Sequence, residues 1–123
     1  MTSNVIDLEH LNAMTGGDAE LAREVLGIFR HQSEIWGRLL VADAPNEQWA
    51  DAAHSIKGAA RSIGAMALGD ACEVAETRGR AGNVAVAEAS VLINAIKDHM
   101  IDAVENLAKV EHQLSMSEAF KAS

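Results

Sequence analysis

Residues 52–76 read AAHSIKGAARSIGAMALGDACEVAE, and this stretch predicts two helices that are separated at Gly64. On both sides of the glycine, apolar side chains recur every three or four residues, which is the period of one face of a helix. Glycine is a common helix stop, so the second helix is expected over about residues 65–77. The first apolar stripe consists of Trp49, Ala52, Ile56, Ala60 and Ile63, and the second of Leu68, Cys72 and Ala75.

Two more helices are predicted before this pair. The first covers about Val5–Met14 and is ended by the sequence TGG at residues 15–17. Asp18 is a favourable N-cap for the second, which is expected to end near Ala42, and Asn46 is then available to cap the first helix of the pair. The apolar stripe of the second helix is expected to comprise Leu21, Val25, Ile28 or Phe29, Gln32, Ile35 or Trp36, and Leu39.

A long helix is predicted after the pair. The segment 78–83 contains Gly79 and Gly82 and is expected to end the preceding helix. Apolar residues then recur at helical spacing until a polar tail begins near residue 115. The expected stripe comprises Val84, Glu88, Val91 or Leu92, Ala95 or Ile96, Met100, Ala103 or Val104, Leu107 and, near its end, Leu114.

The predicted fold class is all-α. Four amphipathic helices with short connections bury their apolar stripes most simply as an antiparallel four-helix bundle, with the short N-terminal helix packed at one end. The composition agrees, because the chain has one Pro, two Phe, two Trp and no Tyr. A chain of 123 residues suits a single domain, expected over residues 1–123 with a core of about 6–114 and a polar tail of about 115–123.

Charge and composition disfavour several classes of function. The formal net charge of −8, without a basic stripe, repels phosphate backbones and anionic lipids, so neither nucleic acid nor a membrane is expected as a partner. The first residues do not resemble a secretory signal, and no apolar run approaches the roughly 20 residues that span a bilayer. A cytoplasmic protein is therefore expected. Cys72 is the only cysteine and is expected to be a buried structural residue.

His54 is the residue that stands out as a candidate for chemistry. On a helical wheel it lies opposite the apolar stripe of its own helix and is therefore expected to face solvent. Asp51, Lys57, Gly58 and Arg61 fall on the same side. Lys57 can donate hydrogen bonds to a phosphoryl group, and Arg61 is a further candidate for phosphate contact.

Gly58 is unusual because it interrupts an alanine-rich helix. Glycine inside a helix costs about 0.5–1 kcal/mol relative to alanine, so an advantage elsewhere should offset that cost. The absence of a side chain one turn from His54 would let the surface of another protein approach the imidazole. Gly58 is therefore a candidate for partner docking.

Glu76 is expected to lie beside His54 although the two are far apart in sequence. Each is 11 positions from residue 65, so in a hairpin that reverses there both lie about 16 Å from the turn. A carboxylate at that level can accept a hydrogen bond from Nδ1–H of His54, which would orient the ring and leave Nε2 as the nucleophile.

The sequence resembles the family of histidine-containing phosphotransfer domains. The stretch GGDAEL at residues 16–21 and the Ile-Phe pair at residues 28–29 also match, and helix order and spacing agree from about Ile6 to Leu114. Coincidence is a poor explanation for so long a match. The residues that carry the resemblance are His54, Lys57, Gly58, Gly64, Ala65, Leu68, Cys72 and Glu76.

This resemblance implies a phosphorelay protein that carries a phosphoryl group on His54. The expected partners are receiver domains of response regulators, or a hybrid histidine kinase, and the receiver is expected to bring the divalent metal. The chain has no ATP-binding motif, so it is expected to be a carrier and not a kinase, without a cofactor and as a monomer. Two alternatives remain: direct phosphorylation of His54 by a histidine kinase, and a helical interaction module without chemistry.

The other histidines do not indicate a metal site. They lie on different predicted elements, without another His, Cys or carboxylate at metal-ligand spacing. The sequence therefore predicts no bound metal. These residues are His10, His31, His99 and His112.

Overall fold

The structure is a computed structural model that describes the backbone of residues 6–122 and the side chains of residues 6–116. Within these residues the chain forms helices and no strand, which confirms the predicted all-α class. In chain order, the helices are α1 (Leu8–Met14), α2 (Ala19–Leu39), α3 (Asn46–Ser62), α4 (Met66–Ala81) and α5 (Val86–Ala122).

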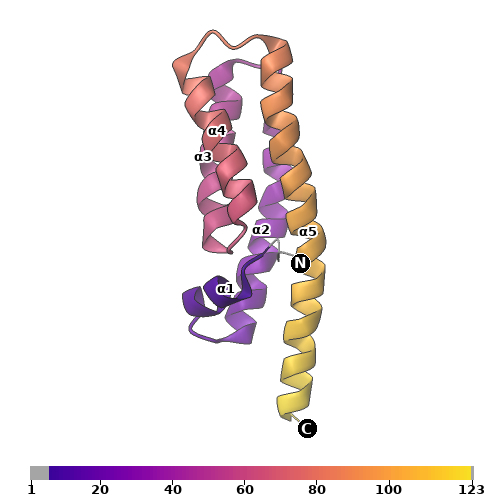
Figure 1. Ribbon diagram of the computed structural model, residues 1–123. Coiled ribbons are helices and arrows are strands. Elements are labelled where there is room, and N and C mark those ends of the chain that lie inside the picture. Colours follow the sequence, from indigo (N-terminus) through magenta and orange to yellow (C-terminus); the bar gives the residue numbers. More distant parts are fainter. Residues whose placement is uncertain (1–5, 123) are drawn as a thin grey trace, which may run out of the picture.

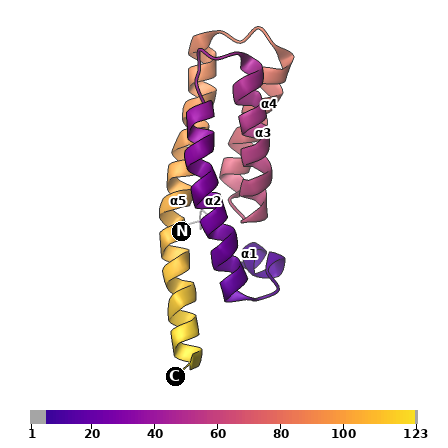
Figure 2. The same cartoon turned by 180° about the vertical axis from the view of Figure 1, so that it is seen from behind.

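Helices α2 to α5 form the predicted antiparallel bundle (Figures 1 and 2). Each packs on the next in chain order, and α5 closes the ring by packing on α2. The tightest pair is the α3–α4 hairpin. Helices α2 and α5 extend past the end of this hairpin, and α1 lies in the space below its turn (Figure 1). The backbone N–H of Asp7 donates to the carbonyl of Gly64 at 3.0 Å, which attaches the start of α1 to that turn.

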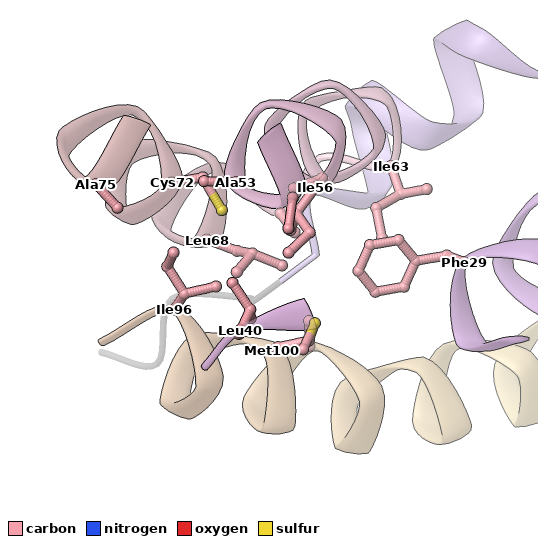
Figure 3. Packing of buried hydrophobic residues seen from close by; sticks show 14 of the residues in the cluster. Phe29, Leu40, Ala53, Ile56, Ile63, Leu68, Cys72, Ala75, Ile96 and Met100 are labelled. Carbon is pink, nitrogen blue, oxygen red and sulfur yellow. The ribbon is translucent and has the colours of Figure 1, made fainter. Parts of the chain in front are cut away.

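The core lies between the four long helices (Figure 3). All five residues of the stripe predicted for α3 are buried, and so are the three predicted for α4. Phe29 of α2 and Met100 of α5 approach this surface from the other side of the bundle (Figure 3). The hairpin therefore presents its apolar side to α2 and α5 and its opposite side to solvent.

The helix ends agree with the sequence in part. Asp18 caps α2 as predicted, because its carboxylate accepts from the backbone N–H groups of Glu20 and Leu21. Asn46 does not cap α3: Pro45 occupies the N-cap position and Asn46 is already the first helical residue. Helix α1 begins at Leu8, after an Asp7 cap, whereas the predicted start at Val5 lies outside the described residues.

The apolar stripe of α2 is rotated from the predicted one by about one residue. Ala22, Leu26 and Phe29 are buried, and Val25 and Trp36 are partly buried against the core. The helix also ends at Leu39, before Ala42, because the chain turns there and buries Leu40. Leu21 and Leu39 of the predicted stripe are instead exposed. At the two positions with alternatives, Phe29 and Trp36 face the core, and Ile28 and Ile35 are exposed.

Helix α4 is longer than predicted, since it continues through Gly79 to Ala81. A Cβ atom at position 79 would lie 2.8 Å from Cζ3 of the buried Trp49, so glycine here permits close packing of α4 on α3. The prediction had treated Gly79 as a stop signal. The helix ends instead at Gly82, whose φ of 81° is in the left-handed region.

Helix α5 differs from the prediction in its ends and in part of its stripe. It begins at Val86 and continues to Ala122, past the expected end near residue 115. Ile96, Met100, Ala103 and Leu107 are buried as expected, whereas Glu88 is exposed and Ala89 is buried in its place. None of the helices described here is at once long and apolar enough to cross a membrane.

Candidate functional site

His54 lies in the middle of α3 on the side that faces away from the core. Its neighbours Ala53 and Ile56 are fully buried, and the helical turn between them directs His54 outward. The His54 side chain is 64% exposed, as predicted from the helical wheel. An incoming protein can therefore reach the ring.

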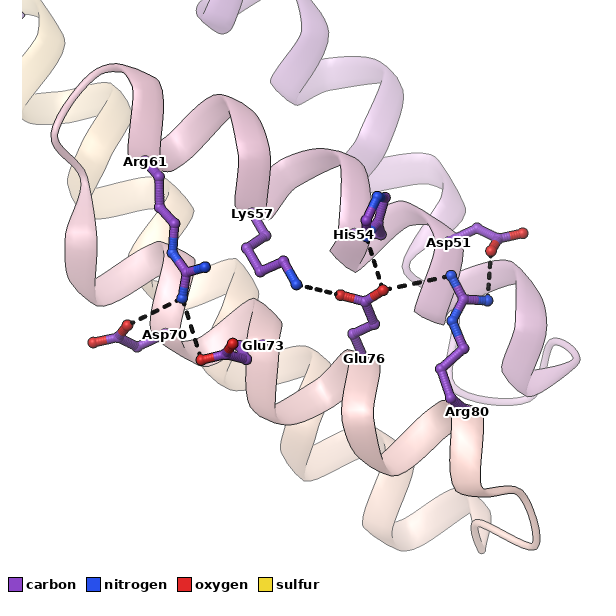
Figure 4. Close-up of polar contacts among 8 residues, drawn as sticks. All are labelled: Asp51, His54, Lys57, Arg61, Asp70, Glu73, Glu76 and Arg80. Carbon is purple, nitrogen blue, oxygen red and sulfur yellow. Dashed lines mark hydrogen bonds and ion pairs between the residues drawn. The ribbon is translucent and has the colours of Figure 1, made fainter.

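Glu76 of α4 contacts His54 at the level that the hairpin geometry predicts (Figure 4). Its Oε2 atom lies 2.8 Å from Nδ1 of His54, and its Oε1 atom accepts a hydrogen bond from Nζ of Lys57 at 2.7 Å. The Glu76 side chain is only 14% exposed. Each oxygen of one mostly buried carboxylate is therefore bound to a different residue of α3.

The contacts of Glu76 determine which nitrogen of His54 carries a proton. The hydrogen bond from Lys57 is the largest of the effects that hold the pKa of Glu76 below its usual value, and the hydrogen bond from His54 adds to it, against the opposing effect of burial. An ionised carboxylate only accepts hydrogen bonds. Nδ1 of His54 must then be the donor, which leaves the lone pair of Nε2 on the exposed ring of the neutral imidazole.

Lys57 is bound to Glu76 in the structure, and its side chain is mostly buried. In this arrangement Lys57 holds the Glu76 carboxylate in place. It therefore supports the group that orients His54. Its donation to a phosphoryl group stays a prediction.

Gly58 leaves an open surface one turn from His54. A Cβ atom at this position would have no neighbour within 4 Å. No packing contact with the described residues therefore accounts for glycine here, in contrast to Gly79. This is the geometry expected if the clearance serves a partner.

Arg61 is directed away from His54 (Figure 4). Its stem packs over Gly69, where a Cβ atom would lie 2.9 Å from Cγ of Arg61. Its guanidinium lies 3.2 Å from Glu73 and 3.6 Å from Asp70, both on α4. The structure therefore does not bring Arg61 together with His54, Lys57 and Glu76.

Arg80 is a site residue that the sequence analysis missed. It lies one turn after Glu76 on α4, and its Nη2 atom is 3.6 Å from Oε2 of that residue. Its Nη1 atom is 2.6 Å from Asp51 and 3.7 Å from Glu47, both on α3. The i to i+4 relation to Glu76 could have indicated it, but the predicted helix ended at Thr77 and left Arg80 in a loop.

Cys72 is part of the core and not of this site. Burial raises the pKa of its thiol to about 12, so the reactive thiolate is suppressed at neutral pH. Among the described residues, no group of three or more His, Cys, Asp or Glu side chains is arranged to hold a metal ion.

Two comparisons with known proteins identify the family of this chain. The model of the Hpt domain family matches residues 18–114. The crystal structure of the histidine phosphotransferase ShpA from Caulobacter crescentus is similar, with a TM-score of 0.71 and 30% sequence identity over 94% of this chain and 98% of that chain. No curated protein sequence matches. With His54 exposed on the hairpin of this bundle, the chain belongs to the Hpt domain family and has a histidine phosphotransfer role in a phosphorelay.

Proposed function

We propose that His54 is the phosphoacceptor, which takes a phosphoryl group from the phosphoaspartate of one receiver domain and passes it to another. The observation that carries this proposal is the contact between Glu76 and Nδ1 of the exposed His54 ring. Through this contact the carboxylate accepts the hydrogen bond from Nδ1–H, which keeps the proton on the inner nitrogen and leaves the outer one as a nucleophile. We further propose that the protein is a carrier without ATP-dependent activity of its own.

The chemistry needs no separate base on this chain. The lone pair of Nε2 attacks phosphorus, an N–P bond forms, and the P–O bond to the aspartate breaks with its electrons leaving on the carboxylate. The ring gains positive charge in this step while Nδ1 keeps its proton. The ionised Glu76, held by Lys57, stabilises that charge. Transfer to a second aspartate is the reverse, and the receiver supplies the divalent metal in both directions.

The surface beside His54 is suited to a receiver that covers Gly58 and part of α2. We define the apolar row as Leu21, Ile28, Ile35 and Leu39, which are exposed and share one side of α2. This is the side next to α3, because the carbonyl of Leu39 accepts a hydrogen bond from Gln48. The other flank of α2 faces α5, to which Arg30 is joined through Glu111.

The apolar row reaches the level of His54. Since α2 and α3 run antiparallel and Gln48 lies opposite Leu39, His54 lies at about the level of residue 33 of α2. At 1.5 Å per residue, Ile28 and Ile35 are then within about 8 Å of that level along the bundle. On the α4 side, by contrast, the surface is occupied by ion pairs of Arg61 and Arg80. We therefore propose that the receiver docks from the α2 side.

A phosphotransfer assay tests the assignment of His54. Receiver domains are phosphorylated with labelled acetyl phosphate, freed of the reagent and mixed with the protein. The wild type should take label from at least one receiver and none from ATP alone. His54→Gln should take none and keep its helical circular dichroism, because the replaced side chain faces solvent. His112→Gln, which replaces another exposed histidine on α5, is the matched control and should label normally. Label retained by His54→Gln would disprove the assignment.

A further inference from the structure

Arg80 is shared between two groups of carboxylates beside His54 (Figure 4). One terminal nitrogen is paired with Asp51 and, more distantly, with Glu47, while the other is near the Glu76 oxygen that contacts His54. Arg80 is 39% exposed, and Asp51 and Glu47 are more exposed still. The guanidinium is therefore held by contacts that solvent screens.

We propose that Arg80 is a counter-ion for the phosphoryl group on His54, and that Asp51 limits its availability by competing for it. The inference rests on the proposed phosphorylation of His54. In the unphosphorylated state Asp51 holds the guanidinium. When His54 carries a phosphoryl group, Arg80 leaves Asp51 and pairs with the phosphoryl oxygens.

The distances place Arg80 within reach of such a group. Its Nη2 atom lies 3.6 Å from Oε2 of Glu76, and that oxygen lies 2.8 Å from Nδ1 of His54. The guanidinium is thus separated from Nδ1 of the ring by a single carboxylate oxygen. The phosphoryl group would be on Nε2, the other ring nitrogen, so Arg80 has to move past this oxygen to reach it. A guanidinium also matches phosphoryl oxygens well, because it can donate two parallel hydrogen bonds.

The other cations near His54 are less free to pair with a phosphoryl group on its ring. Lys57 is mostly buried and bound to the other oxygen of Glu76. Arg61 is packed on Gly69 and paired with two carboxylates on α4. Arg80 and Arg61 are about equally exposed, and both are paired with exposed carboxylates. Only Arg80, of these two, also lies near the Glu76 oxygen that contacts His54.

Phosphorylation changes the balance of charge in favour of this exchange. A phosphoryl group adds up to two negative charges beside Glu76 and Asp51, and like charges at this distance repel. Movement of Arg80 towards the phosphoryl group offsets that repulsion. The pair with Asp51 that it gives up is exposed and screened by solvent, so little stabilisation is lost.

The equilibrium constant of phosphotransfer measures how much Arg80 stabilises the phosphorylated state. The receiver identified with the wild type is mixed with each variant, and the ratio of phosphorylated protein to phosphorylated receiver is followed until it is constant. Arg80→Gln should lower the equilibrium constant by about two- to five-fold, because the phosphorylated state loses its counter-ion. Asp51→Asn should raise it by a similar factor, because Arg80 is released.

The double variant separates this mechanism from a general effect of charge. If Asp51 acts through Arg80, Asp51→Asn should have little effect in the Arg80→Gln background. Asp70→Asn, which removes a carboxylate from the Arg61 pair, is the matched control and should leave the equilibrium constant unchanged. An equal effect of Asp51→Asn in both backgrounds would overturn the proposal, as would an Arg80→Gln variant with the wild-type constant. Failure of the wild type to take label would instead disprove the phosphoacceptor assignment.

Discussion

Replacement of Gly58 by alanine should stabilise the folded protein, although the residue lies next to the proposed phosphoacceptor. The structure provides the reason, because the new methyl group would meet nothing within 4 Å and the backbone is already helical. The expected gain is the difference in helix propensity, about 0.5–1 kcal/mol in the free energy of unfolding. A stabilising substitution at this position would show that glycine is not required by the fold.

The size of the effect can be expressed as a melting temperature. At about 2.1 cal/mol/K per residue, the unfolding entropy of this 123-residue chain is about 260 cal/mol/K. A gain of about 0.5–1 kcal/mol then raises Tm by roughly 2–4 °C. Thermal unfolding followed by circular dichroism resolves such a shift, and urea titration gives the free energy independently.

Gly79→Ala is the matched control for this measurement. Its Cβ atom would lie 2.8 Å and 2.9 Å from two carbons of the fully buried Trp49 ring. Overpacking of this kind costs about 1–3 kcal/mol, which exceeds the gain in helix propensity, so this variant should be destabilised. If both variants shift Tm in the same direction, local packing does not distinguish the two glycines, and the argument that Gly58 is a clearance for a partner loses its basis.

Three further predictions concern the contacts around His54. Lys57→Ala should slow phosphoryl transfer at least about ten-fold in rapid-quench assays, since a hydrogen bond to a charged group is worth about 1.5–3 kcal/mol. An unchanged rate would mean that Lys57 has no part in holding Glu76. Because the folded pKa of Glu76 is lowered, its ionisation stabilises the fold above about pH 4.5, and this contribution is lost as the pH falls through the folded pKa. The wild type should therefore lose its stability advantage over Glu76→Gln in urea titrations between pH 5.5 and 3, whereas a constant difference would contradict the shift. Ile28→Glu, at a side chain that is 63% exposed, should weaken receiver binding in calorimetric titrations, while Val91→Glu on α5 should not; equal effects would exclude docking on the apolar row.

The hairpin and the centre of the site could be predicted from the sequence because both depend on helical periodicity. The stripe from Trp49 to Ile63 fixes which side of α3 is buried, and His54 then has to face outward. Its pairing with Glu76 follows from equal distances to the turn. These inferences need only the rise and the rotation per residue of an α-helix, so they do not depend on details of side-chain packing.

The prediction of the buried stripe of α2 was partly wrong because two apolar rows on this helix have the same helical period. On α2, neighbouring apolar rows both repeat at helical spacing, and the sequence does not show which row the other helices cover. Contact with α3 and α5 selects Ala22, Leu26 and Phe29. The part of the predicted stripe that is left outside, which is the apolar row, is the proposed docking surface. Periodicity therefore indicates that a row is apolar, whereas tertiary packing decides whether it serves the core or a partner.

Gly79 shows why Arg80 was missed while Glu76 was found. A glycine near a helix end indicates a stop only when its conformation is left-handed, as at Gly82, and a sequence does not show φ. Gly79 is instead required by the Trp49 ring on the neighbouring helix, and the helix that continues through it places Arg80 one turn after Glu76. The same close packing of α3 on α4 brings the guanidinium to Asp51. A core contact therefore fixes the geometry of the polar site, because Trp49 lies on the helix that carries His54, and Gly79 lies on the helix that carries Glu76 and Arg80.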